Sequence, residues 1–187
     1  MEINLPERIA CGAYTLRFFT LQDADAVQLY CSDFKIAKTT HIAHPYPCGT
    51  ANRWIATHPA QRALSASYYY AIANAKDEVI GSVSVLFYKE HFRAEIGYWV
   101  GVPFWGKGIC TQAVCAIIRA VFMHTDVNKI CAMYLSNNPA SGRVLQKAGM
   151  HQEGHFAQHV VQYAEVLDQI YCAILRGKWE ETHVDSQ

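Results

Sequence analysis

Several short runs in the first hundred residues alternate between hydrophobic and polar positions, which is the period of a β-strand. Tyr14–Phe19 alternates in this way. Ser67–Ala73 and Val79–Phe87 flank the polar turn Asn74–Asp77, so they predict a hairpin. Arg93–Gly101 predicts a further strand. Its two faces differ in character: Ala94, Ile96, Tyr98 and Val100 form one, and Glu95, Gly97 and Trp99 form the other.

Other segments carry hydrophobic residues at helical spacing. The clearest is Gly108–His124, whose wide apolar stripe is typical of a helix packed deeply against a sheet. Asp23–Cys31 has acidic residues in its first turn, where the helix dipole favours them. Thr50 can cap a helix that runs to about Arg62. Ser141–Ala148 predicts a short helix.

The second half of the chain alternates helix and strand. Lys129–Leu135 predicts an apolar strand between two helices. His151–Trp179 predicts two strands around a turn near Ala164 and Glu165. Strands followed by helix, strand, helix and two more strands indicate a mixed α/β sheet. The chain of 187 residues fits one compact domain.

Composition and charge narrow the possible functions. Lys plus Arg and Asp plus Glu number 16 each, so the net charge is zero, which argues against a nucleic-acid partner. No stretch approaches the roughly 20 apolar residues of a membrane span. Met1–Arg8 shows no apolar run, so we expect no signal peptide and a cytoplasmic location. The seven cysteines include no C-x-x-C pair, so we expect reduced thiols and no zinc site.

A glycine-rich loop between a predicted strand and the strongest predicted helix is a candidate anion site. It runs from Gly101 to Thr111. Gly106 and Gly108 allow tight backbone turns, and the first amides of the following helix have no internal partners. Such a helix N-terminus suits phosphate, and Lys107 could add a contact. A strand-to-helix turn that needs glycine only for its geometry is the alternative.

The same loop partly matches a nucleotide-binding P-loop. Gly101, Gly106 and Lys107 have the required spacing, but Gly108 stands where the motif needs Ser or Thr to hold magnesium. Pro103 also removes one backbone N–H from the loop. These departures make a nucleoside triphosphate the weaker interpretation.

A second motif decides between these interpretations. Leu135–Met150 predicts a strand end, a capped helix and a terminating glycine. Together with the glycine loop, it resembles the GNAT superfamily of N-acetyltransferases. Over about residues 14–180 the chain resembles the Rim-type branch, at Leu16, Arg17, Asp23, Ala24, Ala94–Tyr98, Glu153, Gly154, Asp168 and Trp179. Trp105 and Cys110 depart from the usual loop residues, but both leave the backbone amides in place. The matching positions of the two motifs are Trp105, Gly106, Lys107, Gly108, Ile109 and Cys110, then Asn138, Ser141, Val144, Leu145, Lys147, Gly149 and Met150.

The resemblance implies a fold and a coenzyme site. The fold is a mixed central sheet of about seven strands, with helices on both faces and a splayed central strand at Arg93–Val102. The implied reaction moves an acetyl group from acetyl-coenzyme A (acetyl-CoA) to a primary amine, such as a protein N-terminus or a small molecule, without a metal. The implied coenzyme contacts are Val100 and Val102 to the pantetheine, the loop Trp105, Gly106, Lys107, Gly108, Ile109, Cys110 and Thr111 to the pyrophosphate, and Asn138 and Ser141 on the far side.

The motifs alone leave more than one candidate for each catalytic role. An attacking amine must lose a proton, and Glu95 is our candidate base, with a solvated or salt-bridged strand carboxylate as the alternative. The family's usual tyrosine acid falls at Leu145 here, so that device is absent. Ser141 is the nearest hydroxyl and could protonate the leaving thiolate or serve only in helix capping. Tyr98 is a further candidate.

The histidines of the tail and Cys110 have structural interpretations. His151, His155 and His159 share a spacing of four, but we predict exposed histidines rather than a metal site. Cys110 at a helix start predicts packing rather than a nucleophile. Besides the transferase, a non-catalytic acyl-CoA sensor on the same scaffold remains open, and a homodimer is compatible with the sequence.

Overall fold

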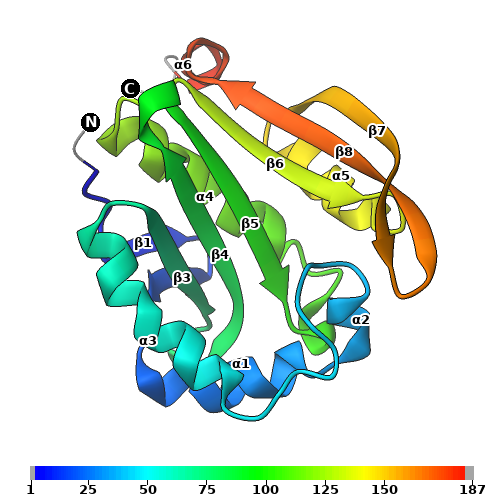
Figure 1. Ribbon diagram of the computed structural model, residues 1–187. Helices are drawn as coiled ribbons and strands as arrows, with labels where there is room; N and C mark the ends of the chain where they lie inside the picture. The colour runs from blue at the N-terminus through cyan, green and yellow to red at the C-terminus, as the bar shows by residue number, and fades with distance from the viewer. Residues whose placement is uncertain (1–2, 184–187) are drawn as a thin grey trace.

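The computed structural model describes residues 3–183 as an eight-stranded mixed sheet with helices on both faces (Figure 1). The strand order is β1-β2-β3-β4-β5-β6-β8-β7. Only β5 and β6 run parallel, because α4 connects them across the sheet. The strands are β1 (Arg8–Cys11), β2 (Tyr14–Phe18), β3 (Ser67–Ala73), β4 (Val79–Tyr88), β5 (Arg93–Val100), β6 (Lys129–Leu135), β7 (His151–Gln162) and β8 (Glu165–Leu175).

The helices divide between the two faces of the sheet. On one face α4 and α5 cover the central strands, and on the other face α1 and α3 lie across β3 and β4 (Figure 1). The expected mixed sheet with helices on both faces is confirmed. The helices are α1 (Ala24–Cys31), α2 (Phe34–Ala37), α3 (Thr50–Ala63), α4 (Ile109–His124), α5 (Pro139–Lys147) and α6 (Arg176–His183).

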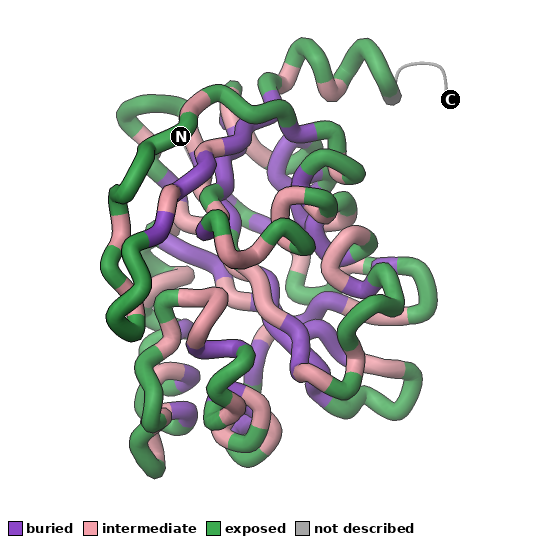
Figure 2. Tube along the Cα trace, turned by 90° about the vertical axis from the view of Figure 1, so that its right-hand side faces the viewer, coloured by how far each residue is buried: buried purple, intermediate pink, exposed green. Residues whose placement is uncertain are grey.

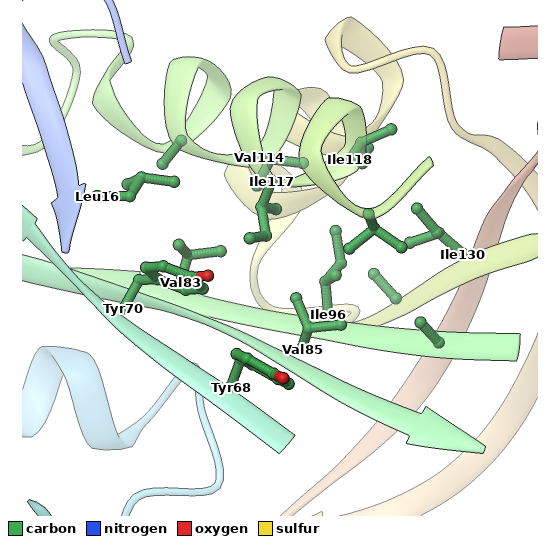
Figure 3. Packing of buried hydrophobic residues seen from close by; sticks show 14 of the residues in the cluster. Leu16, Tyr68, Tyr70, Val83, Val85, Ile96, Val114, Ile117, Ile118 and Ile130 are labelled. Atoms are coloured by element: carbon green, nitrogen blue, oxygen red, sulfur yellow. The ribbon is translucent and has the colours of Figure 1, made fainter. Parts of the chain in front are cut away.

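The main core lies between α4 and the sheet. Val114, Ile117 and Ile118 of α4 are at most 1% exposed and pack against strand residues such as Val83 and Ile96 (Figure 3). Burying such a continuous apolar stripe accounts for most of the stability of a helix in this position. Figure 2 shows the buried positions gathered along the central strands, with exposed positions over the outer loops and helix α6. No helix in the described part of the chain is long and apolar enough to cross a membrane.

Four details differ from the sequence prediction. An additional strand, β1, pairs with β2 and makes the sheet eight-stranded; its four residues were too few to show a period. The short helix α2 was missed for the same reason. The tail strand ends at Leu175 and helix α6 follows, so Trp179 is helical. Helix α3 is capped by Gly49 at φ +74°, and Thr50 is its first residue rather than its cap.

The central feature for function is the divergence of β5 from β6. The two strands pair only at their start, where Arg93, Ala94 and Glu95 face Lys129, Ile130 and Cys131. Beyond this point the strands separate and leave a wedge-shaped gap in the middle of the sheet (Figure 1). The expected splayed central strand is therefore confirmed, and its open edge starts at Ile96.

Candidate active site

The open edge of β5 presents unpaired backbone groups to the gap. Gly101 donates its amide to the carbonyl of Ile80 on β4 at 2.9 Å. Backbone groups of successive strand residues point to opposite edges of the strand. Because Gly101 points toward β4, the even-numbered residues of β5 point toward β6. Past the last β5–β6 pair these residues are Ile96, Tyr98 and Val100. An extended ligand could pair with them as an added strand.

The glycine loop follows directly at the end of this edge. Gly106 and Gly108 have φ values of +74° and +73°, a region that only glycine adopts at low cost. A Cβ at Gly106 would meet no atom within 4 Å, so this glycine is required for its backbone angle and not for lack of space. Among residues 3–183, the amides of Gly106, Lys107 and Gly108 find no hydrogen-bond acceptor. The N-terminus of α4 thus offers a row of free donors to an anion.

The first turn of α4 extends this row of donors. The first backbone bond of the helix is Gln112 to the carbonyl of Gly108, at 3.1 Å, so the amides of Ile109, Cys110 and Thr111 precede it. The Cys110 side chain is largely enclosed, and burial raises the pKa of its thiol to about 12. A thiol with so high a pKa is a poor nucleophile, which agrees with a packing role.

Trp105 anchors the loop to the strand before it. Its indole Nε1 donates to the carbonyl of Val100 at 2.7 Å. Val100 therefore offers its amide, but not its carbonyl, to the gap, and its side chain is buried. Val102 lies in the short 3-10 turn Val102–Phe104 between strand and loop. From the motif alone, Trp105 is only a tolerated replacement, and its hydrogen bond to Val100 is not predicted. This hydrogen bond is the tether between loop and strand.

Helix α5 closes the other side of the gap. Asn138 caps it, because its side chain accepts from the Ser141 amide at 3.2 Å. The Ser141 hydroxyl lies 2.7 Å from the hydroxyl of Tyr98, which also donates to the Ser141 carbonyl at 3.1 Å. Burial raises the pKa of Tyr98 far above its usual value, so this phenol stays protonated. The Tyr98–Ser141 pair spans the gap, and nothing in the sequence spacing predicted that these two residues would meet.

A cavity of about 520 Å³ opens beside the gap on the face covered by α1 and α3. It reaches Tyr98, Asn138 and Ser141 on one side and the loop before α3 on the other. Its side chains are uncharged apart from any proton on His41. The aromatic lining residues are His41, Tyr46, Trp54, Tyr69, Tyr98, Trp99 and Tyr134, and the polar lining residues on the sheet are Ser82, Ser84 and Gln169.

Glu95 lies at the closed end of the gap. It is half-buried on the same sheet face as Gly97, which lines the cavity, but Glu95 itself does not line it. The Tyr88 hydroxyl donates to the Glu95 carboxylate at 3.3 Å. Arg93 stacks on the Tyr88 ring, with its guanidinium carbon 4.2 Å from the ring centre.

The three tail histidines do not form a cluster. His155 Nε2 pairs with Asp168 at 2.7 Å, while the His159 ring packs against Phe156. The pairing of β7 with β8 shifts between Phe156 and Val160, so a spacing of four does not keep the histidines in register on one face. The described residues contain no group of three His, Cys, Asp or Glu side chains that could hold a metal ion.

The splayed strand, the glycine loop and the capped helix lie together around one gap, and comparison with known proteins shows the family to which such a chain belongs. Residues 14–151 match the acetyltransferase (GNAT) domain family. The chain therefore belongs to the GNAT family of N-acetyltransferases, and the resemblance to its Rim-type members is confirmed by the relatives below.

Matches to individual proteins extend over most of the chain. An N-acetyltransferase of Bacillus licheniformis, p20, is 29% identical over 96% of this chain and 99% of its own length. The ribosomal protein uS5-alanine N-acetyltransferase of Escherichia coli K12 is 25% identical over 73% of this chain and 72% of its own. The structure of RimL, a ribosomal L7/L12 α-N-protein acetyltransferase in complex with coenzyme A, superposes with a TM-score of 0.80 at 18% identity, covering 90% of this chain and 98% of RimL.

Proposed function

We propose that this N-acetyltransferase binds acetyl-CoA along the open edge of β5 and transfers the acetyl group directly to a primary amine in the adjacent cavity. The observation that carries the proposal is the continuity of the site. The open edge of β5 runs into the glycine loop at one end, and the cavity reaches the same edge at Tyr98 through the gap. Donor and acceptor can thus meet in a ternary complex, which favours direct transfer.

The donor side fits the coenzyme chemically. Its pyrophosphate is an anion, and the free amides before and in the first turn of α4 are its natural partners. The pantetheine arm carries amides that can pair with an open strand edge. RimL, which has the same fold, binds coenzyme A. The proposed contacts are Val100 and Val102 for the arm, Trp105, Gly106, Lys107, Gly108, Ile109, Cys110 and Thr111 for the loop, and Asn138 and Ser141 for the far side.

The transfer is an aminolysis of a thioester. The amine nitrogen bonds to the acetyl carbon, the bond from that carbon to sulfur breaks, the amine loses a proton and the thiolate gains one. The free amides of Tyr98 and Val100 at the open edge can donate to the carbonyl oxygen as negative charge develops on it. No covalent enzyme intermediate is required.

Glu95 is the proposed general base. It lies two residues along β5 from Gly97, about 7 Å away, a distance that one water molecule can bridge. It shares the cavity face of the sheet, so the acceptor proton can reach it from the cavity side. Tyr88 holds the carboxylate in place through a 3.3 Å hydrogen bond.

Ser141 is the proposed donor of a proton to the thiolate. Its hydroxyl faces the gap beside Tyr98, whose hydroxyl lies 2.7 Å away and holds it in place. Ser141 regains its proton from solvent, and it takes the role of the tyrosine that stands at the position of Leu145 in many members of this family.

Steady-state acetylation tests the base. Glu95→Gln should lower kcat by roughly 10²-fold near neutral pH, as expected for loss of a general base. The loss should shrink at high pH, where the free amine is already deprotonated. Glu90→Gln changes an exposed carboxylate in the neighbouring 3-10 turn Lys89–His91 and should leave kcat unchanged. Full turnover of Glu95→Gln at every pH would remove the base role from Glu95.

The transferase itself has a separate test. Ser141→Ala should lower kcat, because the departing thiolate loses its proposed proton donor. Acetyl-CoA binding with no turnover on any amine would instead support a non-catalytic sensor.

A further inference from the structure

Four aromatic side chains from four separate segments form the wall of the cavity opposite the gap. Trp54 comes from α3, Tyr69 from β3, Trp99 from β5 and Tyr46 from the loop before α3. All four are half-buried, so each has one face or edge available to a ligand. Surfaces of this kind are typical of sites for flat apolar groups.

The wall is held rigid by rings behind it. The Trp54 and Tyr69 rings meet edge to face, with their centres 5.4 Å apart. His58, which is 1% exposed, stacks on Tyr69 at 4.4 Å and meets the edge of Trp54 at the same distance. Phe19 packs against Trp54 at 5.2 Å. The positions of the two lining rings are thus fixed before a ligand arrives, which reduces the entropy lost on binding.

The charge of the cavity excludes one class of amine. None of its lining residues is Asp, Glu, Lys or Arg. The two acidic side chains of the tail that could have attracted a polycation are paired elsewhere, Glu153 with Lys129 and Asp168 with His155. Apart from the proposed base Glu95 at the closed end of the gap, a polyamine would find no carboxylate among the lining residues for its further ammonium groups, which makes their burial unfavourable.

We infer that the acceptor is a small primary monoamine with a flat aromatic body, packed against Trp54, Tyr69 and Trp99 with its amine directed into the gap. The inference rests on the proposed function and specifies the substrate class of the same site. The cavity of about 520 Å³ lies within the usual range of small-molecule sites, roughly 300–1,000 Å³. Ser82 and Ser84, which face the same space from β4, can accept or donate a hydrogen bond near the amine.

The test compares four acceptors at saturating acetyl-CoA: 2-phenylethylamine, hexylamine, spermidine and a short peptide with a free N-terminal alanine. We expect kcat/KM for 2-phenylethylamine to exceed that for hexylamine by about tenfold, since ring contacts add to simple apolar burial. Spermidine and the peptide should be poorer still. A peptide or spermidine that is acetylated faster than both monoamines would overturn the inference and leave the transferase in place.

Variants of the wall supply the second readout. Trp54→Ala should reduce kcat/KM for 2-phenylethylamine at least tenfold and that for hexylamine less, while Trp54→Phe should retain most of the preference. The dissociation constant of acetyl-CoA should stay within twofold in both variants, which also shows that they fold. Phe156→Ala removes an exposed ring on β7 that does not line the cavity, as a matched control.

The outcomes separate the two proposals. If Trp54→Ala lowers kcat/KM for both monoamines equally, the aromatic preference is wrong although transfer occurs. If acetyl-CoA binds and none of the four amines is acetylated, the proposed function fails together with the inference.

Discussion

The two sides of the gap offer different kinds of groups to a ligand. On the donor side, most of the groups offered to a ligand belong to the backbone: the open edge of β5, two glycines at positive φ and the free amides at the start of α4. On the acceptor side they are side chains, contributed by α3, β3, β5 and a loop. Backbone donors suit a coenzyme that is common to many enzymes, whereas side chains can change with the acceptor. The contrast explains how proteins of one fold can bind the same acyl donor and differ in the acceptor that they acetylate.

The largest expected effect is on the stability of the acceptor side. Arg17 of β2 and Asp23, which begins α1, form a buried bidentate pair at 2.8 and 2.9 Å. Burial by itself would raise the pKa of Asp23, but hydrogen bonds from Arg17 and Thr20 outweigh it and lower the pKa. Asp23→Ala leaves the buried Arg17 guanidinium with the half-exposed Asp77 as its remaining acidic partner. The loss of the buried carboxylate should cost about 3–5 kcal/mol in the free energy of unfolding, measured with denaturant.

The control for this variant lies two residues away. Asp25 is exposed in the first turn of α1, and Asp25→Ala should cost less than about 1 kcal/mol. Equal losses for the two variants would show that the buried pair does not support α1.

A smaller effect concerns pH and the rings behind the acceptor wall. Burial, aided by the Arg62 charge, lowers the pKa of His58 to about 4, from about 6.5 in the unfolded chain. As the pH falls from about 6.5 to 4, His58 becomes protonated in the unfolded chain but stays neutral in the folded protein. The folded state should therefore lose roughly 3 kcal/mol over this range.

His58→Phe keeps a ring beside Tyr69 and removes the titration. The difference in unfolding free energy between wild type and this variant should shift in favour of the variant as the pH falls, followed by denaturant unfolding at several pH values. A difference that does not depend on pH would show that His58 is protonated equally in both states.

The smallest of the three effects tests the donor side. Gly108→Val places a branched side chain at φ +73°, which costs about 1–3 kcal/mol and displaces the amides on either side. We expect acetyl-CoA to bind about 10- to 100-fold more weakly in a calorimetric titration. Gly177→Ala, at an open position in α6, should leave the affinity unchanged. Unaltered binding to Gly108→Val would mean that the loop does not contact the coenzyme.

The donor side was largely predictable from sequence because it is local. Gly106, Gly108 and the start of α4 lie within a few residues of one another, and Asn138 and Ser141 lie three apart in one capped helix. Even there, the tether from Trp105 to Val100 depends on the bend of the loop and was missed.

The acceptor side could not be predicted in the same way. Trp54, Tyr69 and Trp99 are distant in sequence. The pairing of β3, β4 and β5 brings Tyr69 and Trp99 onto one sheet, and Trp54 joins them because α3 packs on β3. The contact between Tyr98 and Ser141 likewise depends on how α5 packs across the gap. The missed elements β1 and α2 contain four residues each, too few for either period to appear.

One measurement tests the central claim that the open edge of β5 joins a donor site to an acceptor site. The protein is incubated with acetyl-CoA and 2-phenylethylamine, and both products are quantified by mass spectrometry. The account predicts acetylated amine and free coenzyme A in equal amounts, with no acetyl group left on the protein. Free coenzyme A without acetylated product for this or any other amine, or an acetyl group retained on the protein, would contradict direct transfer across the gap.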